Sequence, residues 1–278
     1  MLTIDPKKEN TSVIHKYLLG AVAPRPIALA STISKAGAPN LSPFSFFNAF
    51  SANPPILIFS PARRVRGNTI KHTLENIIET KEVVIGIVTD VMAQQVSLSS
   101  CDFEKGVNEF EKAGFTAIKA DLVTPYLIKE SPVNFECKMN EVIKLGEEGG
   151  AGNLVICEVL KIHIKESILD TEQNIDPLKL RALSRLGGDW YGRATKDNLF
   201  QLGKPIGKIS MGFDNLPNEI RASSILSEDD LAILASLEKI PEKISFSQRE
   251  GKNLEEKHIL AKQLLTENKV NEAWQILI

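Results

Sequence analysis

Apolar segments alternate with turn residues over the first quarter of the chain, which is typical of an antiparallel strand meander. A turn rich in Gly, Pro and Asn at 35–40 and the run Asn53-Pro54-Pro55 separate the segments. Pro43 lies inside the second segment, and because proline lacks the N–H that a central strand donates, it predicts an edge strand or a bulge there. The three predicted strands cover 27–33, 41–50 and 56–60.

Helical spacing replaces this pattern after the third strand. An apolar stripe predicts a helix over 69–80, with Asn68 as its N-cap. Residues 82–88 are apolar almost throughout and too few for a typical helix, which favours a buried strand. Two short helices are predicted next, over 90–98 and 106–113.

Two long segments in the middle of the chain have the pattern of strands. Apolar and polar residues alternate from 132 to 145, and a second long strand is predicted over 154–164. The glycine-rich stretch 147–153 between them predicts a turn, so the two strands form a hairpin. We interpret this hairpin as the far wall of a barrel. Asp176 and Pro177 then predict the N-cap and first position of a helix.

The character of the chain changes after about residue 215. Residues 227–230 form a capping box before an apolar stripe, and amphipathic helices are predicted over 254–265 and 270–277. A free tail would leave these stripes in water, although burying such residues is worth ~1.5–3 kcal/mol each. We therefore predict a barrel domain over 1–214 and a helical C-terminal extension over 215–278 that packs on the barrel.

Composition indicates an ordinary globular protein. The 278 residues are 43% hydrophobic and 24% charged, and no uncharged apolar run approaches the ~20 residues of a membrane span. The first residues carry no apolar signal-peptide core, so we expect a cytoplasmic protein without membrane contact. The three cysteines are widely spaced, which predicts reduced thiols and neither a disulfide framework nor a metal site.

Charge is distributed unevenly along the chain. None of its 35 acidic residues lies between Glu9 and Glu75, whereas seven of its 33 basic residues do. In a protein of net charge −2, such a segment predicts a local anionic partner. A helix is predicted to start near Lys71 and Thr73. Its free N–H groups, with the ammonium of Lys71 and the hydroxyl of Thr73, suit a phosphate. The alternative is a β-rich segment whose acidic residues lie elsewhere for no functional reason.

Two stretches of this segment resemble a known family. Residues 22–50 with Asn53-Pro54-Pro55, and Lys71-His72-Thr73, resemble the flavin reductase-like family of FMN-binding split-barrel proteins. The resemblance extends over about 14–194. It implies a mainly β fold, an antiparallel Greek-key split barrel with peripheral helices, that binds FMN and forms a homodimer. His72 stands where the family usually carries Asp, and it would add a switchable positive charge near a phosphate.

The resemblance also implies which residues surround the flavin. Backbone groups of Ser45, Phe46 and Phe47 and the Asn48 amide would face the isoalloxazine edge. The residues implied around the ribityl phosphate are Ser31, Thr32, Ser60, Arg64, Lys71 and Thr73. Hydroxyl groups in strand turns often only cap the backbone, and this alternative stays open for the four hydroxyl residues among them.

A glycine-rich loop at 184–193 resembles a family element that lies near the flavin ring. The resemblance therefore implies that Gly187, Gly188 and Tyr191 contact the substrate, a nicotinamide that binds transiently over the ring. The alternative is a plain glycine turn with its aromatic residues buried behind it.

No set of side chains for catalysis stands out. The four histidines are scattered, and the nucleophile-elbow, zinc-protease and dinucleotide-binding motifs are all missing from the sequence. We therefore predict no catalytic residue, as in an enzyme whose cofactor carries the reaction. The resemblance implies an FMN oxidoreductase that takes hydride from NAD(P)H, with FMN either bound or exchanged. A non-catalytic flavin-binding or storage protein is the alternative, and a nucleic-acid binder is disfavoured by the negative net charge.

Overall fold

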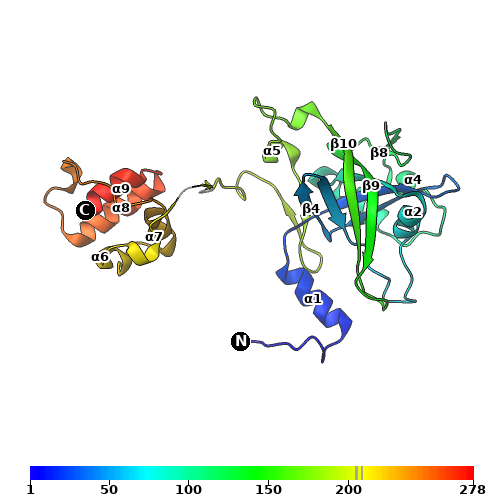
Figure 1. Ribbon diagram of the computed structural model, residues 1–278, viewed down its shortest axis with the longest axis horizontal. Coiled ribbons are helices and arrows are strands. Elements are labelled where there is room, and N and C mark those ends of the chain that lie inside the picture. The colour runs from blue at the N-terminus through cyan, green and yellow to red at the C-terminus, as the bar shows by residue number, and fades with distance from the viewer. Residues whose placement is uncertain (204–205, 208) are drawn as a thin grey trace. The chain divides into compact units, whose positions relative to one another are not determined.

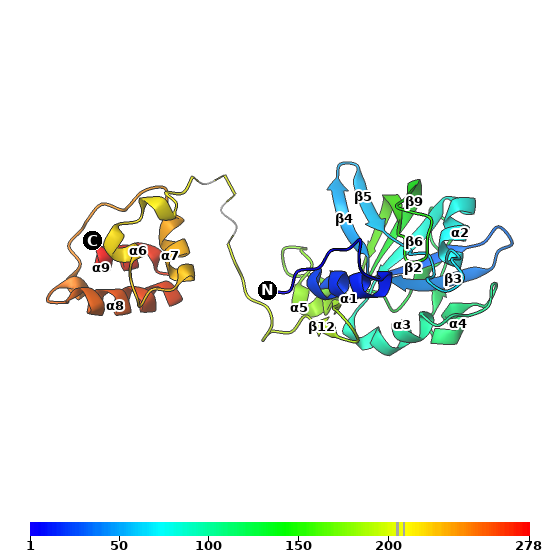
Figure 2. The same ribbon diagram turned by 90° about the horizontal axis from the view of Figure 1, so that it is seen from below.

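The chain forms two compact units, Met1–Phe200 and Gln201–Ile278. The structure, a computed structural model, describes residues 1–203, 206–207 and 209–278. Figures 1 and 2 show the two units from two directions, and each unit is described by itself below. Among the described residues, no helix combines the length and the apolar character that crossing a membrane requires.

The first unit is built on a seven-stranded sheet (Figure 1). Its strands, in spatial order, are β3 (Pro39–Phe44), β2 (Ala28–Ile33), β6 (Glu82–Ile87), β9 (Val133–Lys144), β10 (Asn153–Ile164), β5 (Pro55–Phe59) and β4 (Phe47–Ala52). Every neighbouring pair is antiparallel. The shorter strands are β1 (Arg25–Pro26), β11 (Leu183–Arg185) and β12 (Tyr191–Arg193), which form a second sheet, and the pair β7 (Ala117–Ile118) and β8 (Leu127–Ile128).

The two edges of the large sheet lie close together. β3 and β4 stand at opposite ends of the strand order, yet only Ser45 and Phe46 separate them in the chain. Three Cα steps reach at most about 11 Å, so the sheet must curl until its edges meet. This closure confirms the mainly β, antiparallel split barrel, and the position of Pro43 in an edge strand is confirmed as well.

The predicted single strand over 41–50 is wrong because the chain changes edge in its middle. β3 ends at Phe44 and pairs with β2, whereas β4 begins at Phe47 and pairs with β5. No glycine or asparagine marks the two residues between them, so the hydrophobic pattern runs through the crossing without a visible break. The loop predicted at 184–193 contains the short antiparallel hairpin of β11 and β12.

The long hairpin of β9 and β10 is confirmed, but both of its faces are covered near one end. Asn134 and Glu136, on the face predicted to be polar, are 6% and 0% exposed. The segment 121–128 lies over them, and Glu136 accepts hydrogen bonds from the N–H groups of Asp121 (3.1 Å), Leu122 (2.6 Å) and Val123 (3.1 Å). Both buried polar side chains are therefore hydrogen-bonded, as burial demands.

Short helices surround the barrel. They are α1 (Thr11–Ala21), α2 (His72–Thr80), α3 (Ala93–Ser99), α4 (Glu109–Ala113) and α5 (Pro177–Leu180). α2 contacts β2 and β3 and buries Leu74 and Ile77 in the main core cluster, while α3 and α4 also contact β3 (Figure 2). Asp176 caps α5 as predicted, accepting from the N–H of Leu178 at 2.8 Å. Three helices are thus gathered at one edge strand, β3.

The predicted start of α2 is wrong by three residues. Lys71, not Asn68, occupies the N-cap position. Asn68 has a left-handed backbone with φ 47°, accepts from Arg63 Nε at 2.6 Å and donates to the carbonyl of Glu147 at 2.9 Å. Its side chain holds the loop 63–68, which contains three arginines, to the turn between β9 and β10. It therefore does not cap the helix.

The second unit is helical. It contains α6 (Asn218–Arg221), α7 (Glu228–Ala235), α8 (Leu254–Thr266) and α9 (Val270–Leu277). The capping box at Ser227 is confirmed, with Asp230 as its second member. Leu234 and Trp274 are fully buried in a cluster drawn from this unit, and Trp274 Nε1 donates to the Leu234 carbonyl at 3.2 Å. The apolar stripes therefore bury one another, and packing of the extension on the barrel stays a prediction.

If the first unit alone holds the FMN that the family resemblance implies, a chain ending at Phe200 should bind it with an affinity within about twofold of that of the full chain, a difference of only ~0.4 kcal/mol. The core clusters of the first unit contain only residues before Phe200, so the truncation removes none of them. Titration with FMN, beside circular dichroism to establish folding, checks this. Loss of FMN from a well-folded shortened chain would show that the C-terminal unit contributes to the site.

Candidate functional site

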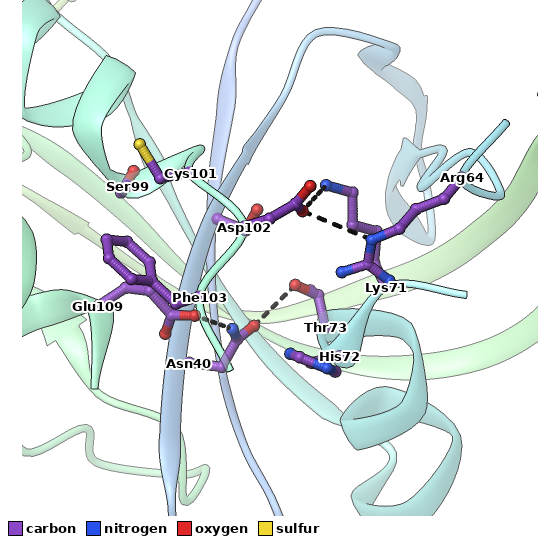
Figure 3. A pocket seen from close by; sticks show the side chains of 11 residues that line it. Asn40, Arg64, Lys71, His72, Thr73, Ser99, Cys101, Asp102, Phe103 and Glu109 are labelled. Carbon is purple, nitrogen blue, oxygen red and sulfur yellow. Dashed lines mark hydrogen bonds and ion pairs between the residues drawn. The ribbon is translucent and has the colours of Figure 1, made fainter. Parts of the chain in front are cut away.

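A polar pocket lies between β3, the start of α2 and the segment that joins α3 to α4 (Figure 3). Its lining combines three basic side chains, two acidic ones and several hydroxyl or amide groups. The lining residues are Asn40, Ser42, Arg64, Lys71, His72, Thr73, Ser99, Cys101, Asp102, Phe103 and Glu109. Three residues predicted from the sequence, Arg64, Lys71 and Thr73, are thus brought together.

Two cations in this pocket converge on one oxygen. Arg64 Nε lies 3.5 Å and Lys71 Nζ 3.7 Å from Oδ1 of Asp102 (Figure 3). Arg64 is also held in place, because its Nη1 donates to the carbonyl of Ile70 at 2.7 Å. The first N–H groups of a helix have no partner within it, and here they belong to α2 beside both cations. The arrangement suits an oxyanion.

Thr73 has a different immediate role from the one predicted. It is 1% exposed, and its hydroxyl donates to Oδ1 of Asn40 at 2.7 Å. Thr32 reaches the same oxygen at 3.3 Å and accepts from Asn76 Nδ2 at 3.1 Å. A threonine hydroxyl has one hydrogen to donate, and that of Thr73 is engaged with Asn40. In this structure Thr32 and Thr73 orient Asn40, and a direct contact of either with phosphate stays a prediction.

Glu109 completes this network and was not found from the sequence. Its carboxylate accepts from Asn40 Nδ2 at 2.8 Å and from the Leu41 N–H at 3.1 Å, and it is 5% exposed. Burial raises the pKa of Glu109, while the hydrogen bonds from the backbone and Asn40 and the charge of His72 oppose that rise. No pattern signals this role, because an acidic residue in the first turn of a helix normally only balances the helix dipole.

A second pocket is lined by the residues of β3 that follow Ser42. Ser42 lines the first pocket, and Pro43, Phe44 and Ser45 line the second, with Ser97 and Ser100 opposite them. Arg185 and Tyr191 also line it, and the guanidinium carbon of Arg185 lies 4.5 Å from the centroid of the Tyr191 ring. The structure therefore brings Ser45 and Tyr191, both predicted from the sequence, into one pocket. A third pocket shares Ser97 and Tyr191 with this one.

The residues that follow Ser45 lie at the start of β4. Phe46 is 39% exposed, Phe47 packs against the main core cluster, and Asn48 is exposed with its Oδ1 accepting from the Ala49 N–H at 2.8 Å. Their predicted contact with the flavin ring is not tested by these positions.

For four other predicted residues the structure shows the local surroundings and does not test the predicted ligand contacts. Ser60 Oγ accepts from the Asn153 N–H at 3.1 Å, and Ser31 is fully buried, with no hydrogen-bond partner for its Oγ among the described residues. Neither serine is among the residues that line the three pockets. A Cβ on Gly187 would lie 2.8 Å from the Cα of Gly20, so this glycine permits close packing on α1, and Gly188 has φ 58°.

Comparison with known proteins agrees with this fold. The sequence model of the family described as "Flavin reductase like domain" matches residues 20–179. The chain belongs to this family. An uncharacterized protein of Aquifex aeolicus (strain VF5) is 38% identical over 188 residues, which are 68% of this chain and 93% of that one. The matched family segment ends before the helical unit.

Two solved structures share the flavin reductase-like fold. Nitrilotriacetate monooxygenase component B from Bacillus cereus is 29% identical, with a TM-score of 0.68 over 73% of this chain and 98% of that one. The 2-nitrobenzoate 2-nitroreductase of Pseudomonas fluorescens is 26% identical, with a TM-score of 0.66 over 76% and 100%. Family and neighbours together place the chain among flavin-related oxidoreductases.

Proposed function

We propose that this protein binds FMN along β3 and passes hydride from NAD(P)H to it. The observation that carries the proposal is the convergence of Arg64 and Lys71 on a single carboxylate oxygen at the start of α2. That oxygen stands in for a phosphate oxygen, since both are anionic acceptors. The phosphate end of FMN would therefore lie at α2, with the rest of the molecule running along β3 towards the second pocket and Ser45.

The residues present fit this cofactor. A phosphate dianion needs cations and N–H donors, and the pocket supplies Arg64, Lys71, His72 and the first turn of α2. FMN, when bound, supplies the hydride chemistry for which the sequence offers no side-chain machinery. Lys71 and Arg64 would bind the phosphate. Asn40, with Thr32 and Thr73, would keep α2 in register with β2 and β3. Ser31 and Ser60 would support the strands.

The second pocket, which Ser45 and Tyr191 line, would contact the ring and the nicotinamide. Backbone groups of Ser45, Phe46 and Phe47 and the Asn48 amide are proposed for the isoalloxazine edge. Tyr191 lines both neighbouring pockets there, and Arg185 over its ring fixes its orientation and adds a positive charge. With Gly187 and Gly188 in the same hairpin, this end is our proposed binding place for NAD(P)H.

Exposed apolar residues support a homodimer as part of the proposal. Phe50 on β4 is 63% exposed, and Leu160 and Ile162 on β10 are 43% and 50% exposed. β10, β5 and β4 are consecutive neighbours at one end of the strand order of the sheet. Apolar residues concentrated in neighbouring elements are typical of a protein–protein contact.

Anaerobic titration with NADPH and with NADH tests the proposal. We expect the purified chain mixed with FMN to shift the flavin spectrum on binding, and the visible flavin band to bleach when the nicotinamide is added. Free FMN under the same conditions is the control. Binding without bleaching by either nicotinamide would favour the alternative, a non-catalytic flavin-binding or storage protein, and no binding would reject both.

A further inference from the structure

We propose that Asp102 holds the two phosphate-binding cations in place until a ligand phosphate replaces it, and that this competition lowers the preference of the site for FMN over riboflavin. This inference rests on the proposed function, because it takes Arg64 and Lys71 as the phosphate site. It goes further by assigning a role in ligand selection to an acidic residue on a different segment.

The contact made by Asp102 is close enough to neutralise the cations and loose enough to be exchanged. A single oxygen, Oδ1, lies 3.5 Å from Arg64 Nε and 3.7 Å from Lys71 Nζ (Figure 3). Charge-assisted hydrogen bonds are ~2.7–2.9 Å long, so both contacts are ion pairs longer than such a hydrogen bond. The Asp102 side chain is also 76% exposed, and exposed ion pairs contribute little to stability.

The segment that carries Asp102 is anchored on its C-terminal side by two contacts. Asn108 caps α4, where its side chain accepts from the Phe110 N–H at 3.1 Å. Lys105, three residues after Asp102, lies with its Nζ 2.7 Å from Oε2 of Glu75 on α2. These anchors keep the Asp102 carboxylate close to the start of α2, where its effective concentration at the cations is high.

FMN and riboflavin meet this carboxylate differently. The phosphate of FMN needs the cations that Asp102 contacts, and the two anions repel each other when both are near. Riboflavin lacks the phosphate and leaves Asp102 with Arg64 and Lys71. Asp102 therefore weakens FMN binding selectively, and specificity is such a difference between two affinities.

The same exchange affects the lifetime of the complex. A tethered carboxylate that returns to the cations assists the departure of the phosphate, and so it raises the dissociation rate of FMN. This favours a flavin that is exchanged between turnovers over one that stays bound, and it addresses the choice that the sequence left open.

The test compares Asp102→Asn with Glu104→Gln in the full chain. Both changes remove one negative charge from the same exposed segment, but Glu104 makes no ion pair with the two cations among the described residues. Affinities for FMN and for riboflavin are measured by flavin fluorescence, and the FMN dissociation rate by stopped flow.

Releasing two exposed ion pairs should lower the FMN dissociation constant of Asp102→Asn by about three- to tenfold. The FMN dissociation rate should fall as well, with riboflavin affinity and both affinities of Glu104→Gln nearly unchanged. Equal changes for both flavins, or an unchanged FMN affinity in Asp102→Asn, would overturn the role of Asp102 while leaving the flavin site intact. Wild-type protein that binds neither flavin would instead remove the proposed function.

Discussion

Replacing Lys71 with alanine will weaken FMN binding by about tenfold or more, because a hydrogen bond between charged groups is worth ~1.5–3 kcal/mol. Lys71 lines the polar pocket at the N-cap of α2, so its ammonium group is lost where the proposed phosphate lies. Arg64 and the helix N-terminus remain, and binding is therefore weakened and not abolished. Isothermal titration with FMN measures the change.

Riboflavin and Arg66 supply the controls for this prediction. Riboflavin carries no phosphate, so Lys71→Ala should leave its affinity nearly unchanged. Arg66→Ala removes a cation from the same basic stretch, but Arg66 is exposed and is not among the residues lining the pocket. It should change FMN affinity only slightly, through screened long-range attraction. Equal losses for FMN and riboflavin in Lys71→Ala would refute the phosphate assignment.

Replacing Glu136 with alanine will lower the free energy of unfolding by about 3–5 kcal/mol, the usual cost of breaking a buried charged network. The carboxylate is fully buried and accepts three backbone N–H groups from 121–123, as well as a 2.6 Å contact from His163 Nε2. Removing it leaves these donors, of which the Val123 N–H is buried, without their partner. Denaturant unfolding followed by circular dichroism measures the change.

The pH dependence of stability gives a second readout for Glu136. Burial alone would raise the pKa of Glu136, but the hydrogen bonds from His163 and from the backbone of 121–123 outweigh it and lower the pKa. A carboxyl whose pKa is lower in the folded state stabilises the fold above its unfolded pKa, about 4.3, and loses that contribution as the pH falls through the folded value. Glu136→Gln should therefore flatten the acid side of the stability curve.

Glu141 provides the matched control for both measurements. It lies on the same strand, β9, and is exposed, so Glu141→Ala should change stability by no more than a few tenths of a kcal/mol. If Glu136→Ala unfolds no more easily than Glu141→Ala, the hydrogen bonds of Glu136 to 121–123 do not hold that segment in solution.

Regular patterns allowed most of the fold to be predicted. The two long strands β9 and β10, the turn between them and the cap at Asp176 were predicted from local signals, and the structure confirms them. The crossing between β3 and β4 was missed because it depends on which strand each half pairs with. Pairing partners are set by the closed barrel as a whole, and no local pattern encodes them.

The candidate site was predictable only where a motif or a charge run marked it. Arg64 and Lys71 were found from the charge run and the family resemblance, and the structure places both in one pocket. Asn40, Asp102 and Glu109 were missed, because their roles arise from segments that are distant in the chain and meet only after folding. Thr32 and Thr73 were found, but their hydroxyl groups contact Asn40, which the sequence did not suggest.

The positions of the three cysteines have a chemical consequence. Burial raises the pKa of Cys157 to about 12 and raises that of Cys137 further still, so both sulfurs stay protonated at neutral pH. Cys101 is exposed and lines the polar pocket, whose lining also includes Arg64 and Lys71. The thiolate is the reactive form of cysteine, and a reagent must also reach it. Of the three cysteines, electrophiles and oxidants in solution will therefore modify Cys101 first, in the polar pocket, where a ligand bound there would shield the sulfur.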